Sequence, residues 1–292
     1  MDPALKEEET KIKELFDSLQ ILAQEGEIPV QAFSMLIKSS NSKVICEQLH
    51  HKWLSDVQFV VYAPKIIMFL HNMDKRDVAL ASGCLALLIN DYKNWNAIRK
   101  KCPLMYRNCV RAICEFYPIY TKIDSYVAES LITPMFNSLN ILLDFSPTEE
   151  DVECMIDLLI KFGHLFSNID SSECDGLVMK MRKILCCDKV NLSSKSRYRV
   201  LQVIDFWTYS WDKRIIPDCL LEFHSEFYKQ QNEQNIKNSG FDVDDGDSLI
   251  DENETTKLTA IEVGKEDAEE GSNFENVIIK VLMRSDNKES AV

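Results

Sequence analysis

The chain has 292 residues, 46% of them hydrophobic and 27% charged, which predicts a mostly globular protein. It contains only 8 glycines and 8 prolines, about half of average usage, whereas strand-rich and nucleotide-binding α/β folds need these residues in turns and phosphate loops. The net charge is −14, and most of it lies at the end of the chain, because residues 238–292 hold 15 acids and 5 bases. The near-neutral remainder excludes an overall basic, nucleic-acid-binding character but not local basic patches.

Apolar residues recur at helical spacing almost throughout residues 12–228. Near the start of the chain, this spacing predicts two helices with an apolar face, one beginning at Ile12 and one at Val30. Further helices are predicted over Val44–Leu54, Val57–Leu70, Val78–Ile89, Leu104–Phe116, Val127–Leu143, Val152–Phe166, Leu177–Leu185, Arg199–Trp211 and Cys219–Phe227.

Local signals mark several helix ends. Thr148 precedes Asp151, and Asp170 precedes Glu173, so each pair can cap a first turn. Pro64 and Pro134 fall inside apolar runs and are expected to kink or split those helices. Helix pairs recur roughly every 40 residues, as in HEAT repeats. We therefore predict an all-α, HEAT-like helical-hairpin solenoid, an armadillo-type superhelix, over residues 1–235.

The composition changes after Gln230. Residues 236–292 are polar and acidic, which predicts a disordered C-terminal tail. Within it, residues 274–284 form a short amphipathic segment, because Phe274, Val277, Ile278, Val281 and Leu282 share one helical face. A short added strand is the alternative for this segment.

Ten cysteines are scattered through the apolar patterns, and the acidic start of the chain has no secretory signal. We expect reduced thiols that act as small core residues. Polar residues interrupt the longest apolar stretch, Val57–Met73, so no membrane span is expected. The expected location is the cytoplasm, with the nucleus as a second location.

Enzyme signatures are missing, because no phosphate-binding glycine loop, nucleophile elbow, zinc-protease motif or C-x-x-C is present. Cys46 and His50 share a helix face, but no second Cys/His pair completes a zinc site, so a buried thiol beside a surface imidazole is expected. We predict no catalytic residue, metal or cofactor. An enzyme stays as an alternative that a deep pocket with paired titratable groups would reveal.

Two segments concentrate basic residues. Residues 92–114 contain no acid, and residues 180–199 contain one. They predict a surface for RNA phosphates or for an acidic partner, and the alternative is a set of ordinary solvated helix faces. The candidate residues are Lys93, Arg99, Lys100, Lys101, Arg107, Arg111, Lys180, Arg182, Lys183, Lys195, Arg197 and Arg199. A neighbouring base, Lys189, belongs to the second segment as well.

Tyr126, Leu131 and Ile132 match the spacing of a peptide motif that binds the cap-binding initiation factor. Here the motif lies inside an apolar helical pattern, so core packing is the expected role.

The third quarter of the chain carries a longer pattern. Glu153, Cys154, Leu158, Leu159 and Gly163 are followed by Ser193, Ser194, Lys195, Arg197, Val203, Ile204, Asp205 and Trp211. This pattern resembles the last two helical hairpins of the middle domain of the translation initiation factor four-gamma family. Leu131, Pro134 and Leu139 further resemble the branch that contains the histone stem-loop-binding-protein-interacting protein and the cap-binding-complex-dependent initiation factor. Phe206 and Trp207 depart from it, because the family has Leu and Arg there.

The resemblance implies a HEAT-like solenoid in which Gly163, Asp205 and Trp211 are structural motif residues. It also implies a non-enzymatic adaptor that regulates translation initiation by linking mRNA, or an mRNA-binding protein, to initiation factors. The implied partners are a DEAD-box helicase, initiation factor three, the histone stem-loop-binding protein and RNA, and the same branch implies a homodimer. A HEAT-type scaffold unrelated to translation is the alternative function.

Overall fold

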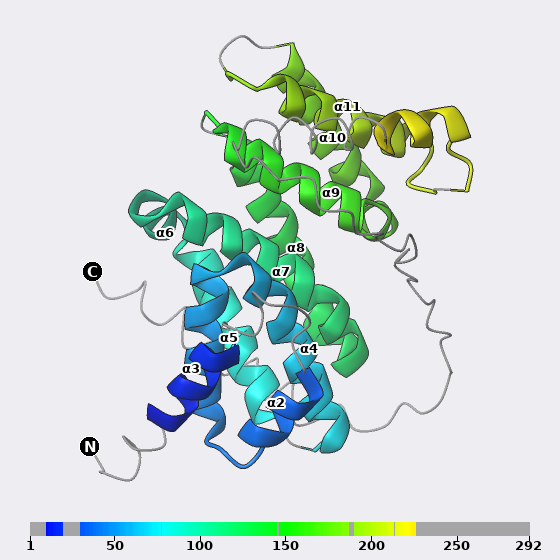
Figure 1. Ribbon diagram of the computed structural model, residues 1–292. Helices are drawn as coiled ribbons and strands as arrows, with labels where there is room; N and C mark the ends of the chain where they lie inside the picture. Colours follow the sequence, from blue (N-terminus) through cyan, green and yellow to red (C-terminus); the bar gives the residue numbers. More distant parts are fainter. Residues whose placement is uncertain are drawn as a thin grey trace, which may run out of the picture. The chain divides into compact units, whose positions relative to one another are not determined.

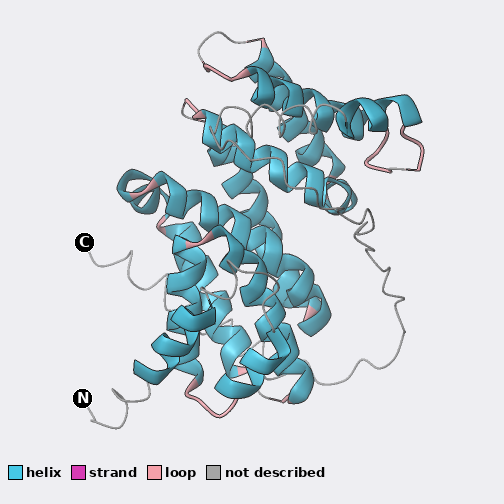
Figure 2. Cartoon of the chain, viewed as in Figure 1, coloured by secondary structure: helices cyan, strands magenta, loops and turns pink. Residues whose placement is uncertain are grey.

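The computed structural model describes residues 10–19, 30–76, 78–144, 146–186, 190–212 and 214–225. Every regular element in these residues is an α-helix (Figures 1 and 2), which confirms the predicted all-α class. Residues 10–19 and 218–225 are helical as well. The predicted acidic tail, residues 236–292 with its segment 274–284, lies outside the described residues. The bounds of the other helices are α2 (Val30–Ile37), α3 (Ser42–Ser55), α4 (Val57–Met73), α5 (Ala79–Lys93), α6 (Trp95–Lys101), α7 (Pro103–Ile123), α8 (Ser125–Leu143), α9 (Glu149–Ile169), α10 (Ser171–Leu185) and α11 (Ser194–Thr208).

The helices up to Trp211 form one compact unit and contact each other in two series. In one series α2 contacts α4, α4 contacts α7, α7 contacts α9 and α9 contacts α11. In the other series α3 contacts α5, α5 contacts α8 and α8 contacts α10. Pairs such as α3–α4, α8–α9 and α10–α11 join the two series, so the packing is repeat-like. Asp212–Glu270 belong to a second unit, of which residues 212 and 214–225 are described.

Single residues separate several consecutive helices. Asp56, Asp124 and Asp170 each have an extended backbone that ends one helix. The side chain of each then accepts a hydrogen bond from a backbone N–H in the first turn of the next helix. Aspartate suits this junction because its carboxylate satisfies donors that a helix start leaves unpaired.

Three helices contain an internal proline and still run without a break. Pro64 lies in α4 and Pro134 in α8, so of the predicted kink or split, the split is wrong. Each of them is buried in the packed unit. Tertiary packing of the apolar face therefore outweighs the hydrogen bond that a proline removes.

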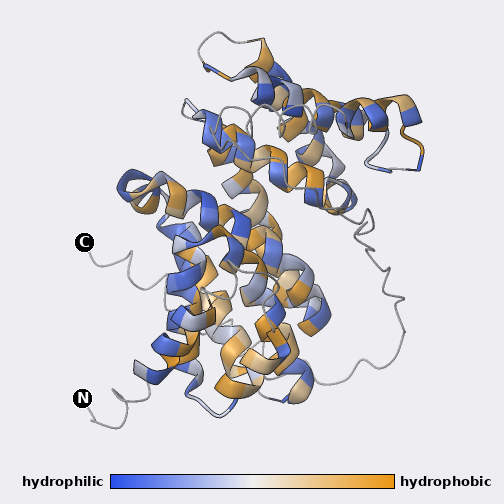
Figure 3. Ribbon diagram, in the orientation of Figure 1, coloured by the Kyte–Doolittle hydropathy of each residue, from blue (hydrophilic) through white to orange (hydrophobic). Residues whose placement is uncertain are grey.

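Apolar and polar residues alternate along the helices, as Figure 3 shows, and the apolar faces form the core. Trp53, Phe116, Tyr106 and Tyr120 are among the largest buried side chains. Both of these tyrosine hydroxyls are paired: that of Tyr106 donates to the Ser138 carbonyl at 3.1 Å, and that of Tyr120 donates to the Ala81 carbonyl at 2.7 Å. None of the described helices is long and apolar enough to cross a membrane.

Two elements differ from the sequence prediction where basic residues are dense. α6 is a short helix that the apolar periodicity does not predict, and it ends in Arg99, Lys100 and Lys101. α11 begins at Ser194 and ends at Thr208, so Trp211 lies beyond the helix and not on it.

Candidate interaction surface

The first basic segment extends from the end of α5 through α6 into α7, and its arginines are engaged with the protein itself. Arg99 Nη2 lies 3.1 Å from Asp151 Oδ2, and Arg107 Nη1 lies 3.1 Å from Asp151 Oδ1. Asp151 is only 2% exposed. Arg99 also donates to the carbonyl of Ile141 at 2.7 Å, one of the last carbonyls of α8. One buried carboxylate therefore ties α6 and α7 to the start of α9.

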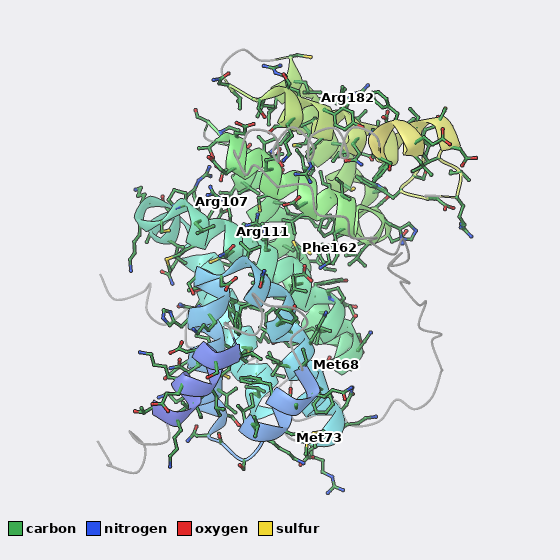
Figure 4. The ribbon with its side chains drawn as sticks, viewed as in Figure 1. Met68, Met73, Arg107, Arg111, Phe162 and Arg182 are labelled. Carbon is green, nitrogen blue, oxygen red and sulfur yellow. The ribbon has the colours of Figure 1, made fainter. Side chains whose placement is uncertain are left out.

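A second group of charges joins α7, α9 and α11. Figure 4 shows Arg107 and Arg111 along α7 where that helix passes α9. Arg111 lies 3.9 Å from Asp157, and Arg199 of α11 lies 2.6 Å from the same carboxylate. Arg199 also pairs with Glu153. The two basic segments thus meet on the acidic side chains of α9, a pairing that their separate positions in the sequence do not reveal.

Three bases of the second segment also have partners. Lys180 pairs with Asp144 at 2.9 Å. Arg197 donates to the carbonyls of Leu192 and Leu185. The guanidinium of Arg182, labelled in Figure 4, lies over the ring of Trp207 at 5.8 Å. Of these three, Arg182 is exposed, so it can still contact a partner.

The remaining five candidate bases are exposed lysines, and none of them forms an ion pair within the described part of the chain. Lys93, Lys100 and Lys101 stand at the ends of α5 and α6. Lys183 lies in the last turn of α10 and Lys195 in the first turn of α11. The lysines at α5–α6, which we call the α6 lysine cluster (Lys93, Lys100 and Lys101), are the candidate site for an anionic partner.

The serine-rich start of α11 has a structural role. The side chain of Ser193 caps the helix by accepting from the Ser196 N–H. The Ser193 N–H donates to Glu149 Oε1 at 3.0 Å, and the Ser196 hydroxyl donates to the same oxygen. Hydrogen bonds to its carboxylate hold the pKa of Glu149 below its ordinary value of 4.5; the bond from Ser193 has the largest effect and the bond from Ser196 the next largest. This part of the family-like pattern therefore docks α11 on the start of α9.

Replacing Ser196 by alanine should raise the pKa of Glu149 towards its ordinary value, because one donor to the carboxylate is lost while the Ser193 cap remains. A lowered carboxyl pKa stabilises the fold above the ordinary pKa, and this contribution is lost as the pH falls through the lowered value. The wild type should therefore have a larger free energy of unfolding than the variant at pH 7, and this difference should vanish in acid. NMR titration of Glu149 checks the shift, with the exposed Ser194→Ala as control. An unchanged Glu149 titration in Ser196→Ala would contradict it.

Gly163 and Trp211 come together although 48 positions separate them in the sequence. A Cβ atom on Gly163 would lie 2.4 Å from the Trp211 ring, closer than packed atoms can approach. Trp211 is 8% exposed and has a positive φ of 61°. Its backbone N–H donates to the Phe206 carbonyl at 2.7 Å. The chain turns sharply after α11 and places the indole on α9. Only a glycine at position 163 leaves room for it.

The departure at Trp207 has a local explanation. Its indole nitrogen donates to Asp175 Oδ1 at 2.7 Å, so the side chain connects α11 to α10. The neighbouring Phe206 is buried, and Asp205 is half-buried on the same helix. The carbonyl of Asp205 accepts the N–H of Tyr209 at the end of α11.

The cap-binding-factor-like motif is split between surface and core. Leu131 is fully buried, as predicted, whereas Tyr126 is 70% exposed, so the prediction of core packing is wrong for the tyrosine. Tyr126 stands in the first turn of α8, where the side chain points away from the packed face.

The described residues offer no metal centre. They contain no group of three His, Cys, Asp or Glu side chains that could hold a metal ion. The Nε2 atom of His50 lies 2.9 Å from Asp91 Oδ2, and the Cys46 thiol is buried beside Cys84.

No known protein-family model matches this chain, and a comparison with curated proteins finds no significant match.

Proposed function

We propose that residues 1–235 form a HEAT-like solenoid that acts as a non-enzymatic adaptor in translation initiation, linking mRNA or an mRNA-binding protein to initiation factors. The contact of Gly163 with Trp211 carries this proposal. These residues belong to the two halves of the pattern that resembles the initiation factor family. Their contact gives a physical reason for the pattern, because the large ring of Trp211 fits only against a residue without a side chain, Gly163.

The two series of helices support the same proposal, because stacked helical hairpins offer long surfaces to extended partners. The partners would be a DEAD-box helicase, initiation factor three or the histone stem-loop-binding protein. RNA is the other candidate ligand. The α6 lysine cluster is the proposed contact, since its three exposed ammonium groups have no carboxylate partner among the described residues.

The adaptor function predicts that the tagged full-length chain recovers initiation factors from a cell lysate whether or not RNase is added. Recovery of unrelated proteins alone would favour a HEAT-type scaffold outside translation. Recovery that disappears with RNase would place RNA between the chain and the factors.

Reversing the α6 lysine cluster to glutamate should weaken binding of a labelled single-stranded RNA at least about tenfold at 50 mM salt, and should lower the salt slope by about 2. Phosphate contacts explain both effects, because each contact releases condensed counterions. The control is Lys183→Glu with Lys195→Glu, which reverses two exposed charges on other helices, so the losses are compared per reversed lysine. Equal losses in the two variants would mean a non-specific charge effect, and no loss in either would leave the lysines as solvated side chains.

A further inference from the structure

Two buried cysteines lie in direct contact between α3 and α5. The thiol of Cys84 donates to Cys46 Sγ at a sulfur–sulfur distance of 3.7 Å. Cys46 is 4% exposed and Cys84 is fully buried. The Cys46 sulfur also lies 3.5 Å from the Leu80 carbonyl oxygen. Among the described residues, the adaptor function uses neither thiol, because both lie away from the α6 lysine cluster and from the Gly163–Trp211 contact.

The backbone of α5 makes room for this contact at Gly83. A Cβ atom at that position would lie 2.6 Å from Cys46 Sγ, so any larger residue would displace the sulfur. Glycine inside a helix costs about 1 kcal/mol relative to alanine. The sequence therefore holds the Cys46 sulfur at short distance from Cys84 in spite of this cost to α5.

A hollow lies beside this pair of helices, lined by neighbours of the two cysteines and not by the cysteines themselves. It has a volume of about 190 Å³, and exposed Lys38 and Asp74 stand at its rim. Ile45, which precedes Cys46 in the sequence, and Leu80, whose carbonyl Cys46 contacts, are among its lining residues. A water molecule needs only about 10–15 Å³ of such space, so a small oxidant of similar size can enter.

We propose that Cys46 and Cys84 are a redox modification site that hydrogen peroxide converts to a disulfide joining α3 to α5. The distance between the sulfurs, the room left by Gly83 and the adjoining hollow carry this inference. To form the bond, the two sulfurs must approach from 3.7 Å to about 2.05 Å.

The chemistry assigns different roles to the two thiols. The hydrogen bond from Cys84 lowers the pKa of Cys46, whereas burial raises that of Cys84. The Cys46 thiolate attacks peroxide, the O–O bond breaks, and the product is a sulfenic acid while the departing hydroxide becomes water with the Cys46 proton. Cys84 sulfur then attacks Cys46 sulfur, the S–O bond breaks, and a second water leaves with the Cys84 proton. Two thiols and one peroxide thus give one disulfide and two waters.

The test oxidises the folded full-length chain with hydrogen peroxide, unfolds it in denaturant, alkylates the remaining thiols and maps the peptides by mass spectrometry. We expect a peptide pair linked through Cys46 and Cys84 that dithiothreitol releases. Buried Cys174, which contacts the Gly163 carbonyl, should stay alkylatable and serves as the internal control. We also expect a higher melting temperature after oxidation, because the bond closes a loop between residues 38 positions apart.

A second variant tests the order of events. In Cys84→Ser the hydroxyl can still donate to Cys46 but cannot resolve its sulfenic acid, so dimedone added as the oxidised chain is unfolded should label Cys46 in that variant and not in the wild type. Exposed Cys186 and Cys219 report that oxidant was sufficient. Recovery of Cys46 and Cys84 as alkylated thiols after Cys186 has been oxidised would overturn the proposal. A disulfide of Cys46 with any other cysteine would overturn it as well.

Discussion

Replacing Gly163 by alanine is expected to lower the free energy of unfolding by about 2–3 kcal/mol, although alanine is the better helix former by about 1 kcal/mol. The added methyl group would lie 2.4 Å from the Trp211 ring, so the indole must leave its place against α9. Its position is already constrained, because Trp211 has a positive φ. Urea denaturation of the full-length chain measures the loss.

Two further variants separate this clash from a general effect on α9. Trp211→Ala should cost about 3–5 kcal/mol, since the ring is nearly buried. Adding Gly163→Ala to that variant should cost nothing or restore some stability, because the clashing ring is gone. Gly176→Ala is the matched control: nothing lies within 4 Å of its Cβ position, so it should stabilise α10 slightly. Additive losses in the double variant would show that the two residues do not act through their contact.

Replacing Asp151 by alanine is expected to lower the free energy of unfolding by about 3 kcal/mol, because it leaves Arg99 and Arg107 without their shared carboxylate. The side chains of the two arginines are only 16% and 12% exposed, so water replaces the lost partner poorly. The variant also loses the capping box that Asp151 forms with Thr148. The loss should depend little on salt, since partly buried ion pairs are weakly screened.

Asp151→Asn separates the charge from the capping hydrogen bonds, because the amide keeps an oxygen acceptor but not the negative charge. We expect it to show most of the loss. Asp157→Ala is the control on the same helix, and because its side chain is 51% exposed it should cost less than about 1 kcal/mol. Equal losses for Asp151→Ala and Asp157→Ala would contradict a special role for the buried carboxylate.

The Gly163–Trp211 contact and the Asp151 ion pairs differ in how far the sequence predicts them. The pattern that contains Gly163 and Trp211 is visible in the sequence, and so is the expectation that both residues are structural. The sequence does not show that the two residues touch, and it places Trp211 at the end of a helix. The structure ends that helix at Thr208 and turns the chain so that the indole reaches α9.

For the basic segments, the sequence predicts a role that the structure leaves open to only some of their residues. Their composition predicts a surface for an anionic partner, yet Arg99, Arg107 and Arg199 pair with carboxylates of α9. The acids of α9 look in sequence like an ordinary helix start, and Asp151 does occupy that first turn. Its two arginine partners lie 52 and 44 positions away, so no local pattern could identify them.

The sequence by itself determines the all-helical class, most helix positions and the caps at Thr148 and Asp170, since periodicity and capping depend on residues within a few positions of each other. The tertiary structure alone decides which bases are paired and which lysines stay exposed. It also decides that α4 and α8 run through their prolines and that Cys46 meets Cys84. These outcomes depend on which helices pack together, and the free energy of that packing comes from residues far apart in the chain.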